Sequence, residues 1–277
     1  MNKVNPLLAV CAVLAAFGGA TSSLCAQGLI WNLPEDGTWI RYEGTYKQVE
    51  IRPDSAEGNL NIEWIRHLTL KSVGRETAEY EGKEVPCRWI EIKVQTGKPS
   101  ETGIDSGRIG ERVNPRIYKV LIPEAAVTGK LRDEQNIPVA FLPIVRGYKK
   151  IGDNDPEEIR TKVLHVYPSI CLIRHFEELK PDPNGPEDPD VGIGPVTATK
   201  YTGKFTLESP TVRSVHETQL WVSKQVPFGL ARWTVKIHQE RKATNEPRSA
   251  FRPAVEVEVS MKAQETGTNA KSELAVP

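Results

Sequence analysis

The chain has 277 residues and a mass of 30.8 kDa, enough for one large domain or two small ones with a substantial hydrophobic core. Its 36 lysines and arginines balance 36 aspartates and glutamates, so the formal net charge at pH 7 is +0. This balance disfavours proteins that bind nucleic acid or an anionic membrane surface through long-range charge. We therefore expect no nucleic-acid partner.

The N-terminus is typical of a secretory signal peptide. Lys3 precedes an apolar run over residues 7–17, and small and polar residues follow at 18–23. The apolar run is shorter than the about 20 residues that a membrane-spanning helix needs. We predict that cleavage after Ala26 removes residues 1–26. The mature protein is then expected to be periplasmic or secreted, and not an integral membrane protein.

The first half of the mature chain predicts a β-meander. Hydrophobic and polar side chains alternate over residues 59–73 and again over 87–95, which is the period-two pattern of half-buried strands. One face of the first strand carries Leu60, Ile62, Trp64, Arg66, Leu68 and Leu70. Residues 96–115 are polar and glycine-rich and are expected to form a loop. A strand over 116–122 and a short helix over 124–134 are expected to follow.

The strongest helix signal lies at residues 155–166. Asp155 is a candidate N-cap, Pro156 suits the first helical turn, and the acidic residues that follow complement the helix dipole. Residues 169–179 fit either a second helix or a strand followed by a turn. Residues 180–195 are rich in proline, aspartate and glycine, which is typical of a linker or surface loop.

The last third of the chain predicts more strands, including a hairpin over residues 218–239. Hydrophobic residues alternate with polar ones after position 230, and Pro227 and Gly229 favour a turn between the two arms. Clean alternation recurs over 255–262. Residues 264–277 lack any pattern, and we expect a disordered tail there.

The aromatic residues of this hairpin allow two interpretations. Trp221 and Trp233 flank the turn, where they are either core residues that fix the strand register as a cross-strand pair or part of an aromatic-lined mouth of a ligand cavity. For the second interpretation, the ligand-cavity candidates are Trp64, Trp221, Phe228 and Trp233.

Two of the four cysteines, Cys87 and Cys171, lie outside the predicted signal peptide. In an oxidising compartment two cysteines can form one disulfide, which here would close a long loop and contribute roughly 3–5 kcal/mol. The alternative is two buried free thiols, which are common in protein cores.

Known catalytic and cofactor motifs are absent from the sequence. It contains no nucleophile elbow, P-loop, dinucleotide fingerprint or zinc-protease motif. His165, Cys171 and His175 lack a second paired motif to complete a zinc site. We therefore name no catalytic residue, metal or cofactor, and favour a non-enzymatic protein.

The predicted elements define an α+β fold of mainly antiparallel β structure, a curved sheet or incomplete barrel covered by one or two helices. A single β-rich domain is expected over 27–263. This pattern resembles the LolA/LppX-like group of exported lipoprotein and lipid carriers. The resemblance rests on the signal peptide, the meander over 59–95, the central helical stretch, the terminal strands and the phrase WVSKQVPFGLARW at 221–233. It implies an apolar cavity between sheet and helices.

Three hypotheses about function remain open. The first is an exported non-enzymatic protein that binds a lipid-like or apolar ligand in a β-sheet cavity. The second is a structural or interaction module of the cell envelope with a solid core and a protein partner. The third is a hydrolase or carbohydrate-active protein whose carboxylates meet only in the fold. Leu60, Ile62, Trp64, Trp233 and Val235 would contact one another in a solid core or line an empty volume in a carrier.

Overall fold

The computed structural model describes residues 28–98, 112–127, 142–173 and 179–276. The predicted signal peptide and most of the expected 96–115 loop lie outside these ranges. The main feature is a mostly antiparallel sheet of 11 strands in the order β7-β6-β4-β3-β2-β1-β13-β12-β11-β10-β9. The expected antiparallel β fold is thereby confirmed, as an open sheet with edges at β7 and β9.

The strands of the large sheet differ greatly in length. Their bounds are β1 Trp39–Glu50, β2 Leu60–Tyr80, β3 Lys83–Gly97, β4 Arg112–Pro123, β6 Arg146–Ile151, β7 Glu157–Glu158, β9 Leu179–Pro181, β10 Thr199–Glu208, β11 Val212–Val222, β12 Leu230–Arg241 and β13 Arg252–Gly267. A separate pair joins β5 Leu142–Pro143 to β8 Val163–Leu164. The helical elements are α1 Tyr167–Cys171 and the 3-10 turns η2 Glu124–Ala126, η3 Pro227–Gly229 and η4 Arg248–Ala250.

Two meanders make up the sheet, and the pairing of β1 with β13 joins them. The first runs from β1 through β4 to β7, and the second runs from β9 to β13. The predicted meander over 59–95 is confirmed as β2 and β3. The predicted hairpin is confirmed as β11, η3 and β12, where Phe228 and Gly229 have φ of 61° and 86°.

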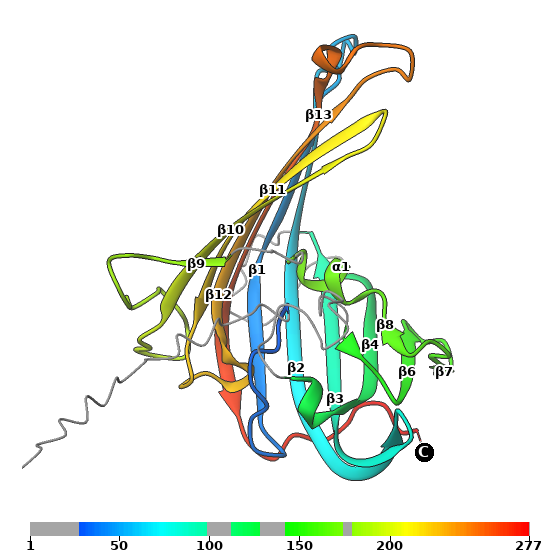
Figure 1. Cartoon of the computed structure of the whole chain (residues 1–277), viewed down its shortest axis with the longest axis vertical. Helices are drawn as coiled ribbons and strands as arrows, with labels where there is room; N and C mark the ends of the chain where they lie inside the picture. The colour runs from blue at the N-terminus through cyan, green and yellow to red at the C-terminus, as the bar shows by residue number, and fades with distance from the viewer. Residues whose placement is uncertain (1–27, 99–111, 128–141, 174–178, 277) are drawn as a thin grey trace, which may run out of the picture.

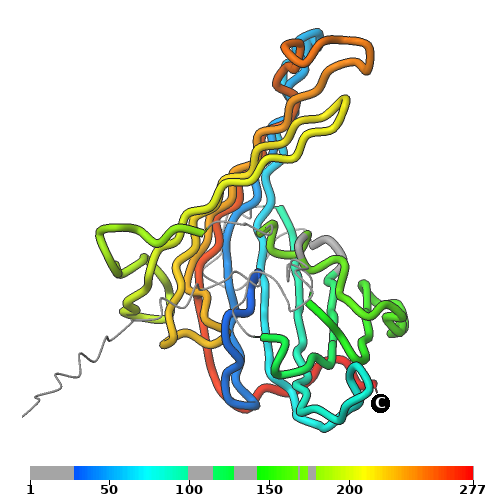
Figure 2. Tube along the Cα trace, viewed as in Figure 1, coloured from blue at the N-terminus to red at the C-terminus, as the bar shows by residue number. Residues whose placement is uncertain are grey.

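The strands at the centre and on one side of the sheet extend beyond the others and form an arm (Figures 1 and 2). We define the arm as residues 46–64, 203–218 and 235–259, which belong to β1, β2, β10, β11, β12 and β13. Its far end consists of the three turns between these strands. The rest of the sheet is the body, and its core-bearing side is the inner face.

The inner face of the body carries a filled hydrophobic core. Tyr42 and Trp233 are buried neighbours in an edge-to-face arrangement, with their ring centroids 5.0 Å apart. Buried residues from seven strands belong to the same cluster: Ile40, Leu68, Leu70, Ile90, Ile92, Val120, Leu220, Val235, Val259 and Met261. Alternate residues of each strand point to this side, as the sequence pattern predicts.

Two segments cover this core. The backbone N–H groups of Leu29 and Ile30 both donate to the Tyr167 hydroxyl of α1, at 2.8 and 3.0 Å. The Trp233 indole donates to the carbonyl of Cys171 at 3.1 Å. The covering is therefore mostly irregular chain, because α1 has only five residues.

The helix predicted over 155–166 is wrong. Residues 157–158 form β7 and 163–164 form β8, and the Ile159 N–H donates to the carbonyl of Gly147 on β6 at 2.7 Å. The predicted capping residues are local signals that also suit turns, and pairing with β5 and β6 overrides them. The predicted helix over 124–134 appears only as η2, and residues 128–134 lie outside the described ranges.

The end of the chain also differs from the expected disordered tail over 264–277. β13 continues to Gly267, and the following segment crosses the outer face of the body, where Leu274 is buried. The backbone N–H groups of Glu273 and Leu274 donate to the Glu91 carboxylate at 2.9 and 3.3 Å. This segment is ordered by polar contacts with a distant strand, so no periodic pattern in its own residues could reveal it.

Candidate functional site

The four residues proposed to line a cavity do not lie together. Phe228 and Trp233 are inside the filled core, with 0% and 1% of their surfaces exposed. Trp64 is half-buried on the inner face of the arm, where it pairs with Tyr46. Trp221 lies on the outer face.

The expected cross-strand pair of Trp221 and Trp233 is also wrong, because the two side chains lie on opposite faces of the sheet. The register places Trp233 opposite Leu220 and Trp221 opposite Arg232, so the two indoles project from opposite faces. Trp221 is held between Arg232 at 5.0 Å and Lys200 at 5.3 Å, and its N–H donates to Glu187. Its environment is a packed cation–π cluster, which excludes it from any inner cavity.

Cys87 and Cys171 are buried free thiols, which is the second of the two alternatives. Cys87 packs with Trp89 and Leu121 in a small cluster, whereas Cys171 belongs to the main core. The two cysteines occupy different hydrophobic clusters, so a bridge between them does not form.

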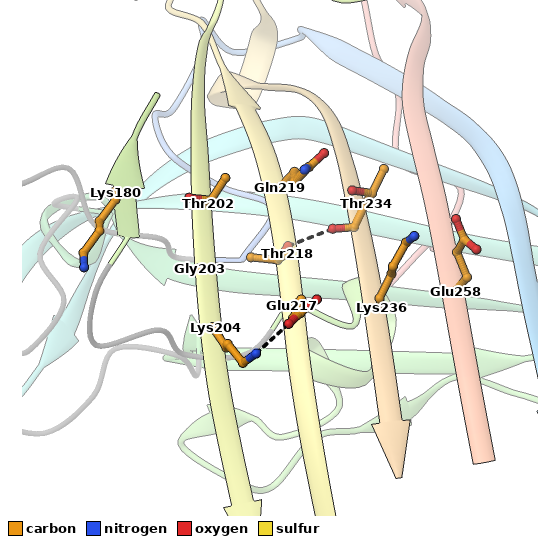
Figure 3. A pocket seen from close by; sticks show the side chains of 10 residues that line it. All are labelled: Lys180, Thr202, Gly203, Lys204, Glu217, Thr218, Gln219, Thr234, Lys236 and Glu258. Carbon is orange, nitrogen blue, oxygen red and sulfur yellow. Dashed lines mark hydrogen bonds and ion pairs between the residues drawn. The ribbon is translucent and has the colours of Figure 1, made fainter. Parts of the chain in front are cut away.

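A groove of about 670 Å³ follows the outer face of the sheet across β10 to β13 (Figure 3). Its lining is polar and includes Lys204, Glu217, Lys236 and Glu258. These four alternate in charge at matching register positions, and Lys47 and Glu63 continue the row on β1 and β2 beyond the groove. Lys204 contacts Glu217 at 2.7 Å and Lys47 contacts Glu63 at 3.2 Å. Such cross-strand pairs stabilise a hydrated sheet face and fix its register.

The electrostatics of this row are those of a solvated surface. The hydrogen bond from Lys204 holds the pKa of the Glu217 carboxyl below its usual value. The charges cancel along the row, and the side chains are largely exposed. We therefore interpret this groove as structural.

A second groove, of about 580 Å³, lies on the inner face of the arm. We call it the arm groove. Its lining comes from β1, β10, β11, β12 and β13: Gln48, Leu207, Glu208, Ser209, Val212, Ser214, His216, Ile237, Gln239, Arg241, Val255 and Val257. The apolar residues among these continue the inner-face pattern of the core into a part of the sheet that is only half-buried.

Two polar residues are buried in the wall of the arm groove. The Ser214 hydroxyl and the His216 Nε2 atom are 2.9 Å apart, and the two residues are only 9% and 3% exposed. They face the same side because they are two residues apart on β11. Their neighbours across the sheet on β12 are Gln239 and Ile237.

Polarity increases along the arm groove from the body to the tip. On β12 the inner positions are Trp233, Val235, Ile237, Gln239 and Arg241 in that order. The first two are buried in the core, the third is half-buried, and the last is exposed. Over the six residues from Val235 to Arg241 a strand rises about 20 Å.

Metal and membrane-spanning features can be assessed for the described ranges only. There, no group of three or more histidine, cysteine, aspartate or glutamate side chains is arranged to hold a metal ion. No helix in those ranges has the length and hydrophobicity needed to cross a bilayer.

Comparison of the sequence with protein-family models and with curated proteins finds no match. The functional argument therefore starts from the geometry of the arm groove.

The arm groove was missed in the sequence because its residues look like ordinary strand residues. A signal was present, however. The positions of β11 that alternate onto the inner face are Val212, Ser214, His216 and Thr218, which are mostly polar although they face the core side. Polar residues on a predicted inner face indicate either a partner or a ligand.

Proposed function

We propose that this protein is an exported, non-enzymatic binding protein that holds one apolar, lipid-like ligand in the arm groove. The observation that carries the proposal is the open apolar stretch of the arm directly beside a closed core. Leu207, Ile237, Val255 and Val257 lie exposed or half-buried on the inner face, where binding an apolar molecule would remove them from water.

The size of the groove supports this proposal. Its volume of about 580 Å³ is within the range of pockets that take small organic ligands, roughly 300–1,000 Å³. On the inner face of the body, Trp233 and Val235 are packed into the core. The ligand is accordingly placed on the arm and not between sheet and helices, where the LolA/LppX-like resemblance would put it. We retain from that resemblance the export, the curved antiparallel sheet and the apolar ligand.

A second candidate function is an envelope interaction module, and the filled core favours it. A protein that only presents a surface needs no internal cavity. In addition, the apolar inner face of the arm extends to Leu60 on β2, which is 37% exposed. In that case an apolar segment of a partner protein would occupy the same groove.

Native mass spectrometry of the protein exported into a bacterial periplasm separates these functions. We expect a bound mass that dissociates as a lipid. Ile237→Asp, which places a charge in the groove, is expected to lose that mass. Val215→Asp is the matched control, because Val215 is half-buried on the neighbouring strand and points to the outer face. Protein without ligand in every gentle preparation would reject the lipid-binding function and favour the interaction module.

A further inference from the structure

At the tip end of the arm groove, the lining residue Arg241 lies opposite Arg252 of the neighbouring strand. Arg241 on β12 pairs with Arg252 on β13, so both side chains leave the same face of the sheet. Like charges at directly opposed positions destabilise a sheet. An anion bound between them would remove this repulsion and accept charge-assisted hydrogen bonds from both.

The carboxylates of Glu208 and Glu246 are already engaged by arginines, and one of these arginines is Arg252 itself. Glu208, which also lines the groove, accepts two hydrogen bonds from Arg248, at 2.7 and 2.8 Å. Glu246 contacts Arg252 at 3.3 Å. Arg241 makes no ion pair within the described part of the chain, and its guanidinium donates a long hydrogen bond of 3.5 Å to the Gln239 side chain.

The apolar part of the groove fixes the direction of a bound molecule. Val255 and Val257 on β13 and Ile237 on β12 lie on the body side of the arginine pair. Ser214, Gln239 and Val255 share one register level, which lies between the level of Ile237 and Val257 and that of the arginines. A molecule with one apolar and one charged end therefore matches the groove in one orientation only.

We infer that the ligand is a single-chain fatty-acid-like amphiphile with a carboxylate head, an inference that rests on the proposed function. Its head lies at Arg241 and Arg252, near the Ser214 hydroxyl, and its chain runs toward Val257 and the core. The lining residues of β12 run from Ile237 to Arg241, a strand rise of about 13 Å along which the first part of an acyl chain can lie.

Fluorescence titration with cis-parinaric acid and with its methyl ester tests this inference, since the two probes differ in the charge of the head. We expect the wild-type protein to bind the acid about tenfold more tightly than the ester. In Arg241→Gln the two affinities are expected to agree within about twofold. Lys236→Gln, on the outer face of the same strand, is the matched control and is expected to retain the wild-type preference.

The possible results distinguish a failure of the head-group assignment from a failure of the proposed function. Equal affinity of wild-type protein for acid and ester would overturn the head-group assignment and leave the apolar-ligand function standing. A preference that survives in Arg241→Gln would also overturn it. Failure of both probes to bind would reject the proposed function itself, and the assignment with it.

Discussion

At the scale of single residues, the carboxylate of Glu91 is a buried charge that requires hydrogen-bond partners. This residue is fully buried on the outer face of β3. It accepts hydrogen bonds from Lys71 at 3.1 Å, from the Ser272 hydroxyl at 2.7 Å and from two backbone N–H groups of the C-terminal segment. A buried charge is tolerated only when such partners replace its lost hydration, so Glu91 ties that segment to the sheet.

We predict that Glu91→Ala lowers the free energy of unfolding by about 3 kcal/mol, because it leaves buried donors without their acceptor. Urea denaturation measures the loss. Glu63→Ala is the control, since Glu63 forms an exposed pair with Lys47 and should cost less than about 1 kcal/mol. Similar losses in the two variants would show that the C-terminal segment does not depend on Glu91.

A second prediction concerns the thiols. Cys87 is fully buried and Cys171 is 1% exposed, so neither is expected to react with a thiol reagent until the protein unfolds. Intact mass after alkylation in denaturant without reductant should show two modified cysteines in the mature chain. An oxidised protein that takes up no label would mean that the two residues are bridged.

At the scale of elements, the contact of β1 with β13 depends on one glycine. A Cβ atom at Gly44 would lie 1.8 Å from the Ser260 carbonyl oxygen and 2.7 Å from the Met261 sulfur. Since the first of these is a backbone atom, the neighbouring strand itself would have to move. Gly44 thus permits the close approach of the two strands that join the meanders.

Gly44→Ala is accordingly expected to destabilise the protein by about 3 kcal/mol through overpacking. Gly58→Ala serves as the comparison, because no atom lies within 4 Å of a Cβ there and only its positive φ of 73° opposes the substitution. That strain costs about 1 kcal/mol. Thermal unfolding of both variants tests whether Gly44→Ala is the more destabilising substitution. A smaller loss of stability in Gly44→Ala than in Gly58→Ala would contradict the close packing of β1 against β13.

The ion pairs of the arm make its stability depend on pH. Hydrogen bonds from Lys204 and Arg213 lower the pKa of Glu217 and Glu240, respectively, below the ordinary value of 4.5. A carboxylate with a lowered folded-state pKa contributes stability above 4.5, and the contribution is lost as the pH falls through the folded value. The double variant Glu217→Gln/Glu240→Gln should therefore lose less thermal stability between pH 6 and pH 3 than the wild type. An equal loss in both proteins would show that these pairs do not contribute.

At the scale of the whole molecule, the sequence predicts the sheet well and the groove poorly. Alternation in β2, β12 and β13 is visible because each has one wet and one dry face over many residues. In β3 the residue types alternate in the same way, although Glu91 on its outer face is buried. The segment over 155–166 was misassigned, since its capping residues suit a helix locally while its backbone pairs with β5 and β6. The arm groove is created by strand register, which places His216 beside Ile237 and Arg241 beside Arg252. Such pairings join positions far apart along the chain, where single-sequence patterns carry no information.

The shape of the molecule explains why the groove and the core coexist. The inner face is one continuous surface. Among the described residues, the covering segments lie over the body, and the arm continues beyond the core (Figure 1). The same alternation that builds the core therefore leaves apolar residues at the arm that a ligand can cover.

Photolabelling with a diazirine-bearing fatty acid, followed by peptide mapping, tests this central claim most directly. We predict that labels fall on residues 205–216 and 235–257 and that excess unlabelled oleate suppresses them. Labels on the peptides of the body, or labelling that oleate does not compete with, would contradict a ligand site on the arm.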